Sequence, residues 1–170
     1  MTRPVTDPAE IRRLLRDRIL PSVQKPARYI GGERGSVRKD PAGVDVGFAL
    51  LFPDLYEVGM SHLGYQILYG ILNARQGVAC ERAYAVWPDM REAMRAHGVP
   101  LFTLESARPV RDFDVVGFSL QYELLCTNVL AMLDLASRLD IGVVIETKTV
   151  DALTESVRRL NERDPRKGYE

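Results

Sequence analysis

Residues 44–74, VDVGFALLFPDLYEVGMSHLGYQILYGILNA, decide the fold. The segment Val44–Phe52 becomes almost continuously apolar, as is typical of a strand covered on both faces in a parallel sheet. Pro53 ends this strand, and we expect residues 54–61 to form a loop. The next segment predicts a helix with a buried apolar stripe, made of Leu63, Ile67, Leu68, Ile71 and Leu72. A strand, a polar loop and a helix in this order favour an α/β sheet with a ligand site at its carboxyl edge.

Strands and helices alternate along the rest of the chain. We predict further strands at 79–85, 100–105, 115–119 and 142–146, and helices at 90–96 (with Asp89 as N-cap), 124–138 and 150–162. This order predicts an α/β fold with a doubly wound, mostly parallel, Rossmann-like sheet and right-handed crossovers. The helix at 124–138 is apolar over much of its circumference, so we expect it to be central, with Cys126 as a core residue.

Three regions follow from this pattern. Residues 1–43 form an N-terminal helix, beginning at Asp7 and Pro8, and a connector; residues 44–162 form the Rossmann-like α/β domain; residues 163–170 form a polar tail. The connector carries Gly31, Gly32 and Gly35, which allow a phosphate loop or a simple turn. Because these glycines precede a strand instead of following one, the sequence favours the connector.

Composition narrows the class of protein. Lys plus Arg equals Asp plus Glu, so the formal net charge is zero, which argues against a dedicated nucleic-acid binder. The arginines of the first helix form either a solvated face or a contact face for RNA or a protein partner; they are Arg12, Arg13, Arg16 and Arg18. The two cysteines form no CxxC pair, and no signal peptide or membrane-spanning run is present. We expect a soluble, cytoplasmic protein with no membrane partner.

Polar and aromatic side chains follow the predicted strands. In a parallel sheet they meet on one rim, which is the default place for a ligand. The rim residues are Asp54, Tyr56, Glu57, Ser61, His62, Trp87, Asp89, Ser119, Gln121, Tyr122 and Glu123.

Each candidate for chemistry on this rim has a structural alternative. His62 is a ligand contact, a metal ligand or a helix-start residue, and no second His or Cys stands at zinc spacing. Asp54 and Glu57 are an acid/base pair or helix-start charges. Trp87 is a flat wall for a planar ligand or an apolar plug. No nucleophile–base arrangement is recognisable, so a stand-alone enzyme acting through Asp54, Glu57 and His62 is only a third hypothesis, and we expect no catalytic residues in this chain.

Five segments resemble one known family, over about residues 25–137. They are KPARYIGGERGSV (25–37), FALLFPDLYEVGMSHLGYQILYGILN (48–73), AYAVWPDM (83–90), PLFTLES (100–106) and FDVVGFSLQYELLCTNVLAMLDLA (113–136). In order and spacing they resemble the N-terminal cobalamin-binding-like domain of a family of uncharacterised radical SAM proteins.

The resemblance implies a Rossmann-like domain of the cobalamin-binding type beside a radical SAM barrel, in cis or in trans. In a complete protein the barrel binds a [4Fe–4S] cluster through CxxxCxxC, and S-adenosylmethionine binds the fourth iron. This chain has no such motif, so the cluster and S-adenosylmethionine belong to a complete protein only. The chain departs from the family pattern after about residue 137, which indicates a truncation, a frame change or a divergent ending.

The resemblance also allows cobalamin, in a base-off mode. Cobalamin domains with a histidine ligand carry DxHxxG, where this chain has Met60 at the Asp position and Tyr65 at the Gly position. We therefore expect no histidine ligand and no metal ligand. The implied cofactor contacts are Tyr56, Glu57, Ser61, His62, Gly64, Trp87, Ser119, Gln121 and Tyr122. The predicted function is an accessory cobalamin-binding-like domain of a radical SAM iron–sulfur enzyme; the alternative is a cofactor-free interaction module that docks a partner protein or RNA.

Overall fold

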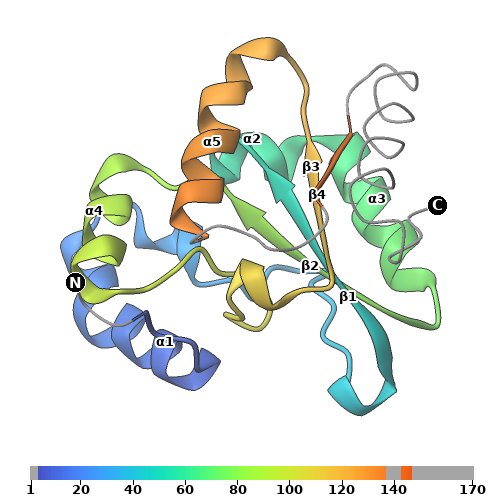
Figure 1. Ribbon diagram of the computed structural model, residues 1–170, viewed down its shortest axis with the longest axis horizontal. Helices are drawn as coiled ribbons and strands as arrows, with labels where there is room; N and C mark the ends of the chain where they lie inside the picture. The colour runs from blue at the N-terminus through green and yellow to red at the C-terminus, as the bar shows by residue number, and fades with distance from the viewer. Residues whose placement is uncertain (1–3, 137–142, 147–170) are drawn as a thin grey trace.

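The computed structural model describes residues 4–136 and 143–146 of the chain. Its centre is one sheet in the order β2-β1-β3-β4, with every neighbouring pair parallel (Figure 1). The strands are β1 (Val44–Phe52), β2 (Gly77–Tyr84), β3 (Val115–Ser119) and β4 (Val143–Glu146). The predicted α/β class and parallel sheet are confirmed.

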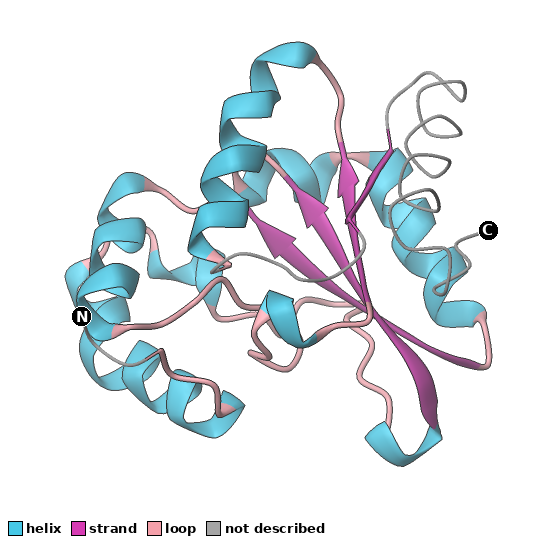
Figure 2. Ribbon diagram, viewed as in Figure 1, coloured by secondary structure: helices cyan, strands magenta, loops and turns pink. Residues whose placement is uncertain are grey.

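The sheet is covered by helices on both faces (Figure 2). The described α-helices are α1 (Pro8–Leu14), α2 (Tyr56–Ser61), α3 (Leu63–Ala74), α4 (Pro88–His97) and α5 (Cys126–Leu135). A π-helical turn, Leu15–Ile19, extends α1, and 3-10 turns lie at Leu20–Ser22, Pro26–Tyr29, Pro41–Gly43, Val110–Asp112 and Glu123–Leu125. None of the described helices is long and apolar enough to cross a membrane.

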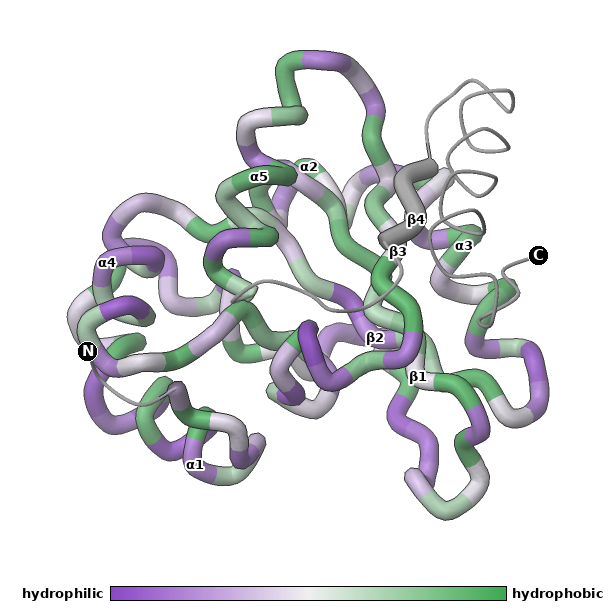
Figure 3. Tube along the Cα trace, viewed as in Figure 1, coloured by the Kyte–Doolittle hydropathy of each residue, from purple (hydrophilic) through white to green (hydrophobic). Residues whose placement is uncertain are grey.

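Alternation along β1 builds two separate cores. Leu50 and Phe52 pack with Tyr65 and Tyr69 of α3 on one face. The other face buries Ala49, Leu51, Val116 and Phe118 against a larger cluster that includes Ile11, Met90, Met94, Val129 and Met132. Figure 3 shows the hydrophobic residues gathered along the central strands. This two-sided burial explains why the strands read as nearly continuous apolar runs.

Local sequence explains where several elements begin and end. The Asp7 carboxylate accepts a hydrogen bond from the Ala9 backbone N–H, and Pro8 opens α1, as predicted. Gly98 ends α4 in the left-handed conformation, with φ of 66°. Asp89 is not the N-cap of α4, because the helix begins one residue earlier, at Pro88, after Trp87. Its carboxylate instead accepts the backbone N–H of Gln24 at 2.7 Å.

The buried stripe predicted for α3 is wrong in its orientation. Leu63, Ile67 and Ile71 are 72%, 51% and 52% exposed, whereas Tyr65 and Tyr69 are buried. The tyrosines bury their rings and still satisfy their hydroxyls: Tyr65 donates to the Leu50 carbonyl at 2.8 Å, and Tyr69 accepts from the Val37 N–H at 2.7 Å. A buried tyrosine with a hydrogen-bond partner contributes more apolar area than an isoleucine, which explains the rotation.

Three further expectations about elements need correction. Residues 54–61 contain α2 and are not only a loop, and residues 100–105 make a single antiparallel bridge, Phe102 to Pro109, instead of a strand. The helix expected at 124–138 begins at Cys126, and it is not central, since Leu130 on it is 67% exposed. Cys126 itself is exposed, not a core residue. Strands 79–85, 115–119 and 142–146 are confirmed within a few residues.

The N-terminal segment packs on the same core as the sheet. Ile11, Leu15 and Ile19 are buried within the larger cluster, on the face that α4 and α5 also cover. In the connector, Gly31 has φ of 66°, and a Cβ there would lie 2.3 Å from the Leu104 carbonyl oxygen, so only glycine fits. The connector interpretation of these glycines therefore agrees with the geometry. The predicted helix 150–162 and the tail 163–170 lie outside the described residues.

Candidate functional site

The order of the strands creates one place where a ligand is expected. From β1 the chain goes to β2 on one side and returns to β3 on the other, so the sheet edge between the carboxyl ends of β1 and β3 is the topological switch point. Asp54 follows β1 and Tyr122 follows β3, and both lie at this edge. The predicted rim thus gathers residues from loops far apart in the sequence.

Side chains bridge the switch point. The Tyr122 hydroxyl donates to Asp54 Oδ2 at 3.2 Å, and Asn128 Nδ2 on α5 donates to the Pro53 carbonyl at 2.9 Å. Desolvation and the hydrogen bond with Asp54 raise the pKa of Tyr122. Next to this bridge, Gln121 Nε2 donates to the hydroxyl of the buried Ser119 at 2.8 Å. The polar groups at the switch point therefore form hydrogen bonds that fix one another's positions.

A second part of the rim is organised by Arg28, which the sequence analysis missed. Its guanidinium donates to Glu57 at 2.9 Å and lies 5.5 Å from the centre of the Trp87 ring. The Lys25 ammonium is 3.7 Å from the Glu57 carboxylate. The backbone N–H of Trp87 donates to the Tyr29 hydroxyl at 3.2 Å. Burial raises the pKa of Glu57, but hydrogen bonds from its own N–H and from Arg28 outweigh burial and lower it.

His62 starts a helix. Its Nδ1 accepts the Tyr65 backbone N–H at 3.1 Å, which makes it the N-cap of α3, and its ring lies 5.4 Å from the Phe52 ring. Ser61 Oγ donates to the Val58 carbonyl at 2.9 Å, within α2. A Cβ at Gly64 would lie 3.2 Å from His62 Cε1, so this corner of the rim is tightly packed. The helix-start alternative for His62 is the one that the geometry supports.

Tyr56 connects the rim to a buried polar cluster beneath it. Its ring makes an edge contact with Tyr84, 5.5 Å between centroids, and burial followed by the charge of Glu33 raises its pKa. Deeper in the fold, Arg82 and Glu105 are 2% and 0% exposed at the side chain and pair at 2.7 Å. Arg82 also lies 3.3 Å from Glu33 and 4.3 Å from the centre of the Tyr69 ring.

This buried pair was not predicted, although the sequence held a hint. The strand ACERAY carries two charged residues, Glu81 and Arg82, and each must find a partner once the strand is covered on both faces. The Glu105 carboxylate accepts both the Arg82 N–H and the Arg82 Nε–H at 2.7 Å. The pair ties β2 to the 100–106 segment and to the glycine connector, so it supports the rim from below.

The predicted site residues thus fall into two groups. Ser119, Gln121 and Tyr122 stand at the switch point; Tyr56, Glu57, Ser61, His62 and Gly64 belong to α2 and the start of α3, and Arg28 joins Glu57 to Trp87. Trp87 and Tyr122 are 42% and 47% exposed, so the rim offers aromatic surface. Among the described residues, no group of three or more His, Cys, Asp or Glu side chains could hold a metal ion.

Fold and rim define an α/β domain with polar and aromatic side chains gathered at the carboxyl edge of a parallel sheet. Comparison with protein families gives a match to the N-terminal region of radical SAM proteins over residues 64–142. The matched span runs from the start of α3 through β2, α4, β3 and α5, and it supports a radical SAM N-terminal domain. No curated protein and no solved structure matches the chain significantly.

Proposed function

We propose that this chain is the accessory N-terminal domain of a radical SAM iron–sulfur enzyme, with the catalytic barrel in the same protein or in a partner. The observation that supports this is the family match, because residues 64–142 include the loops after β2 and β3 that build half of the rim. The barrel would carry the [4Fe–4S] cluster and S-adenosylmethionine. The two cysteines of this chain are 46 positions apart, Cys80 to Cys126, and cannot form the cluster motif.

We infer that the barrel docks against the carboxyl rim. Exposed aromatic and apolar side chains are gathered there: Trp87 and Tyr122 are about half exposed, and Leu124 is 83% exposed. Aromatic residues are enriched in protein interfaces. Covering exposed apolar groups with a partner removes them from water, which favours binding. The Arg28 contact with Trp87 and the Asp54 contact with Tyr122 hold both rings in defined positions before any partner arrives.

A titration of the chain with a purified radical SAM barrel tests this function. The variants Trp87→Ala and Tyr122→Ala should each weaken binding by at least about tenfold, as expected for aromatic residues central to an interface. Arg13→Ala is a matched control, since its side chain is 58% exposed on α1 and its one salt-bridge partner among the described residues is Glu10. Equal affinity of the wild type and both rim variants would refute rim docking.

Corrinoid binding is the finer part of the proposal. A corrinoid on this rim would cover the rings of Trp87 and Tyr122 in a base-off mode, with no cobalt ligand from His62, whose Nδ1 already caps α3. Titration with hydroxocobalamin should then change the visible spectrum, and Trp87→Ala should weaken the change. If no spectral change occurs and no corrinoid stays with the protein in gel filtration, the cofactor is removed from the proposal and barrel docking stands.

One observation favours the second candidate, a cofactor-free interaction module. Residues 58–74 contain no Asp, Glu, Lys or Arg, and the exposed face of α3 is made of Leu63, Gly64, Ile67, Gly70, Ile71 and Ala74. An apolar helix face of this kind suits an apolar helix of a partner protein, not RNA. If Ile67→Glu abolishes barrel binding and Trp87→Ala leaves it intact, the α3 face is the docking surface.

A further inference from the structure

Two cavities whose linings include none of the predicted rim residues meet at a pair of arginines. One, of about 240 Å³, lies between the π-helical turn after α1 and residues 102–107; the other, of about 550 Å³, lies at the amino ends of β1 and β2. Arg12 and Arg38 line both cavities. The two hollows therefore form one groove, which we call the Arg12–Arg38 groove.

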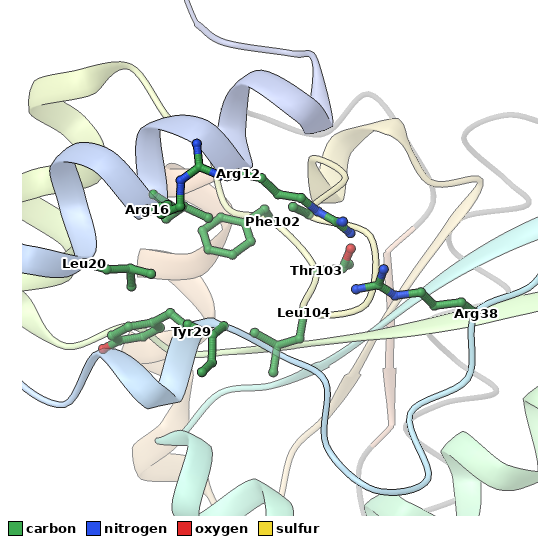
Figure 4. A pocket seen from close by; sticks show the side chains of 11 residues that line it. Arg12, Arg16, Leu20, Tyr29, Arg38, Phe102, Thr103 and Leu104 are labelled. Atoms are coloured by element: carbon green, nitrogen blue, oxygen red, sulfur yellow. The ribbon is translucent and has the colours of Figure 1, made fainter.

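The smaller cavity combines positive charge with an apolar wall. Its lining contains three arginines and no carboxylate, and the remaining wall is largely apolar: Leu15, Leu20, Tyr29, Ile30, Phe102, Leu104 and Ala107. Figure 4 shows the Arg12 and Arg38 side chains converging near Thr103 at one end, with Leu20, Tyr29 and Phe102 farther along the cavity. The lining thus separates a cationic end from an apolar end.

The two guanidinium groups are short of negative partners. Arg12 donates to the Glu105 carbonyl oxygen at 3.0 Å, and within the described residues neither Arg12 nor Arg38 makes a salt bridge. Desolvation and the charge of Arg38 lower the pKa of Arg12, the opposite of what an ion pair does to an arginine. The carboxylate of Glu81 is engaged elsewhere, by Thr103 Oγ1 and Ser106 Oγ at 2.5 Å each. The charge of Glu81 offsets the lowering of the Arg12 pKa only in part. Asp45, Glu81 and Asp114 line the larger cavity, but in the described part of the chain none of them forms a salt bridge with Arg12 or Arg38, so the two neighbouring cations attract an anion.

Hydrogen bonds link the segments that form the wall opposite α1. Glu81 on β2 also accepts the Ser106 backbone N–H at 3.2 Å, and Ala107 adopts a left-handed conformation with φ of 59°. Such a φ is unfavourable for a residue with a Cβ, and it persists only where surrounding contacts fix it. Thr103 and Ala107 both line the smaller cavity. Hydrogen bonds between β2 and residues 103–106 therefore support this side of the groove.

We propose that the Arg12–Arg38 groove binds a small organic anion, with a phosphate or carboxylate group between the two guanidinium groups and an apolar body against Tyr29 and Phe102. A planar, forked guanidinium matches both oxyanions, and a cavity of about 240 Å³ has room for one ring or a short chain. The linings include none of the predicted rim residues, although Tyr29 accepts the Trp87 backbone N–H, so the site does not depend on the radical SAM proposal.

Calorimetric titration of the full chain with phenyl phosphate, inorganic phosphate and phenol tests the site. Phenyl phosphate should bind most tightly, because it alone uses both ends of the groove. Arg12→Gln and Arg38→Gln should each weaken phenyl phosphate by about tenfold or more, as expected for a charge-assisted hydrogen bond. Both residues are exposed, so folding should be kept, and circular dichroism checks it.

Arg13→Gln is the matched control, since Arg13 lies on the same helix but lines neither cavity. The proposal is overturned if wild-type protein shows no binding of phenyl phosphate at millimolar concentration. It is also overturned if phenyl phosphate binds no more tightly than inorganic phosphate, or if Arg13→Gln weakens binding as much as Arg12→Gln and Arg38→Gln.

Discussion

Replacing Glu105 by glutamine should be among the most damaging single changes in this fold. Glutamine keeps the shape of the side chain but removes the charge that faces Arg82 inside the protein. The Arg82 and Glu105 side chains are 2% and 0% exposed, and the shortest contact between them is 2.7 Å. The variant leaves a buried guanidinium whose one remaining salt-bridge partner in the described part of the chain is Glu33, at 3.3 Å.

The size of the effect follows from this geometry. At 2.7 Å and an effective dielectric constant of about 20, the attraction between two unit charges is about 6 kcal/mol. The attraction between Arg82 and Glu33 remains in the variant and compensates part of this loss. We therefore expect the free energy of unfolding to fall by about 3–5 kcal/mol, the usual cost of removing one partner from a buried pair. For a chain of this length, such a loss lowers the melting temperature by about 10 °C.

Urea unfolding followed by circular dichroism measures the loss. The control is Asp134→Asn, which breaks the Arg95–Asp134 pair; that pair has a contact of 2.6 Å, but its side chains are 56% and 67% exposed. The control should cost less than about 1 kcal/mol. Replacing both Arg82 and Glu105 by methionine should cost less than either single replacement, because neither member of the fully buried pair is left alone and Glu33 is partly exposed. Similar losses for Glu105→Gln and Asp134→Asn would refute the reasoning.

Three further predictions concern single side chains. His62→Ala should lower the free energy of unfolding by about 1 kcal/mol in a urea titration, because it removes the N-cap of α3, whereas His62→Asn should restore most of it; equal losses would contradict the capping role. Cys126 is exposed and burial raises the pKa of the Cys80 thiol, so one thiol should react quickly with a disulfide reagent and the second only after unfolding; mass spectrometry that places the fast label on Cys80 would be the opposite result. Burial raises the pKa of Tyr69 from 10.0 to about 12, so its stabilising contribution is complete below about pH 10 and is lost as the pH rises through about 12. Tyr69→Phe should flatten that part of a plot of unfolding free energy against pH, and an unchanged plot would exclude Tyr69 as the source.

The sequence predicts the sheet well because burial on two faces leaves a direct trace. A strand that packs against helices on both sides is apolar at every position, and Pro53 and Gly98 mark the ends of elements through backbone chemistry alone. The rim follows from the same reasoning, since the carboxyl ends of parallel strands share one edge. These predictions depend on local pattern and on topology.

The parts that were missed depend on contacts between distant segments. The pattern of isoleucines on α3 predicted the wrong face, because Tyr65 and Tyr69 find hydroxyl partners at Leu50 and Val37 that periodicity cannot show. Arg28 contacts Glu57 from 29 residues away, so neither side chain signals the other in the sequence.

Hydrogen–deuterium exchange of this chain, free and bound to a radical SAM barrel, is the most direct test of whether the chain is an accessory domain that docks the barrel through its rim. Binding should slow exchange in the rim segments 85–89 and 119–124, which carry Trp87, Tyr122 and Leu124. Residues of the Arg12–Arg38 groove should exchange at the same rate in both states. No protected segment in the presence of excess barrel would contradict the assignment as an accessory domain, and protection confined to α3 would move the interface from the rim to that helix.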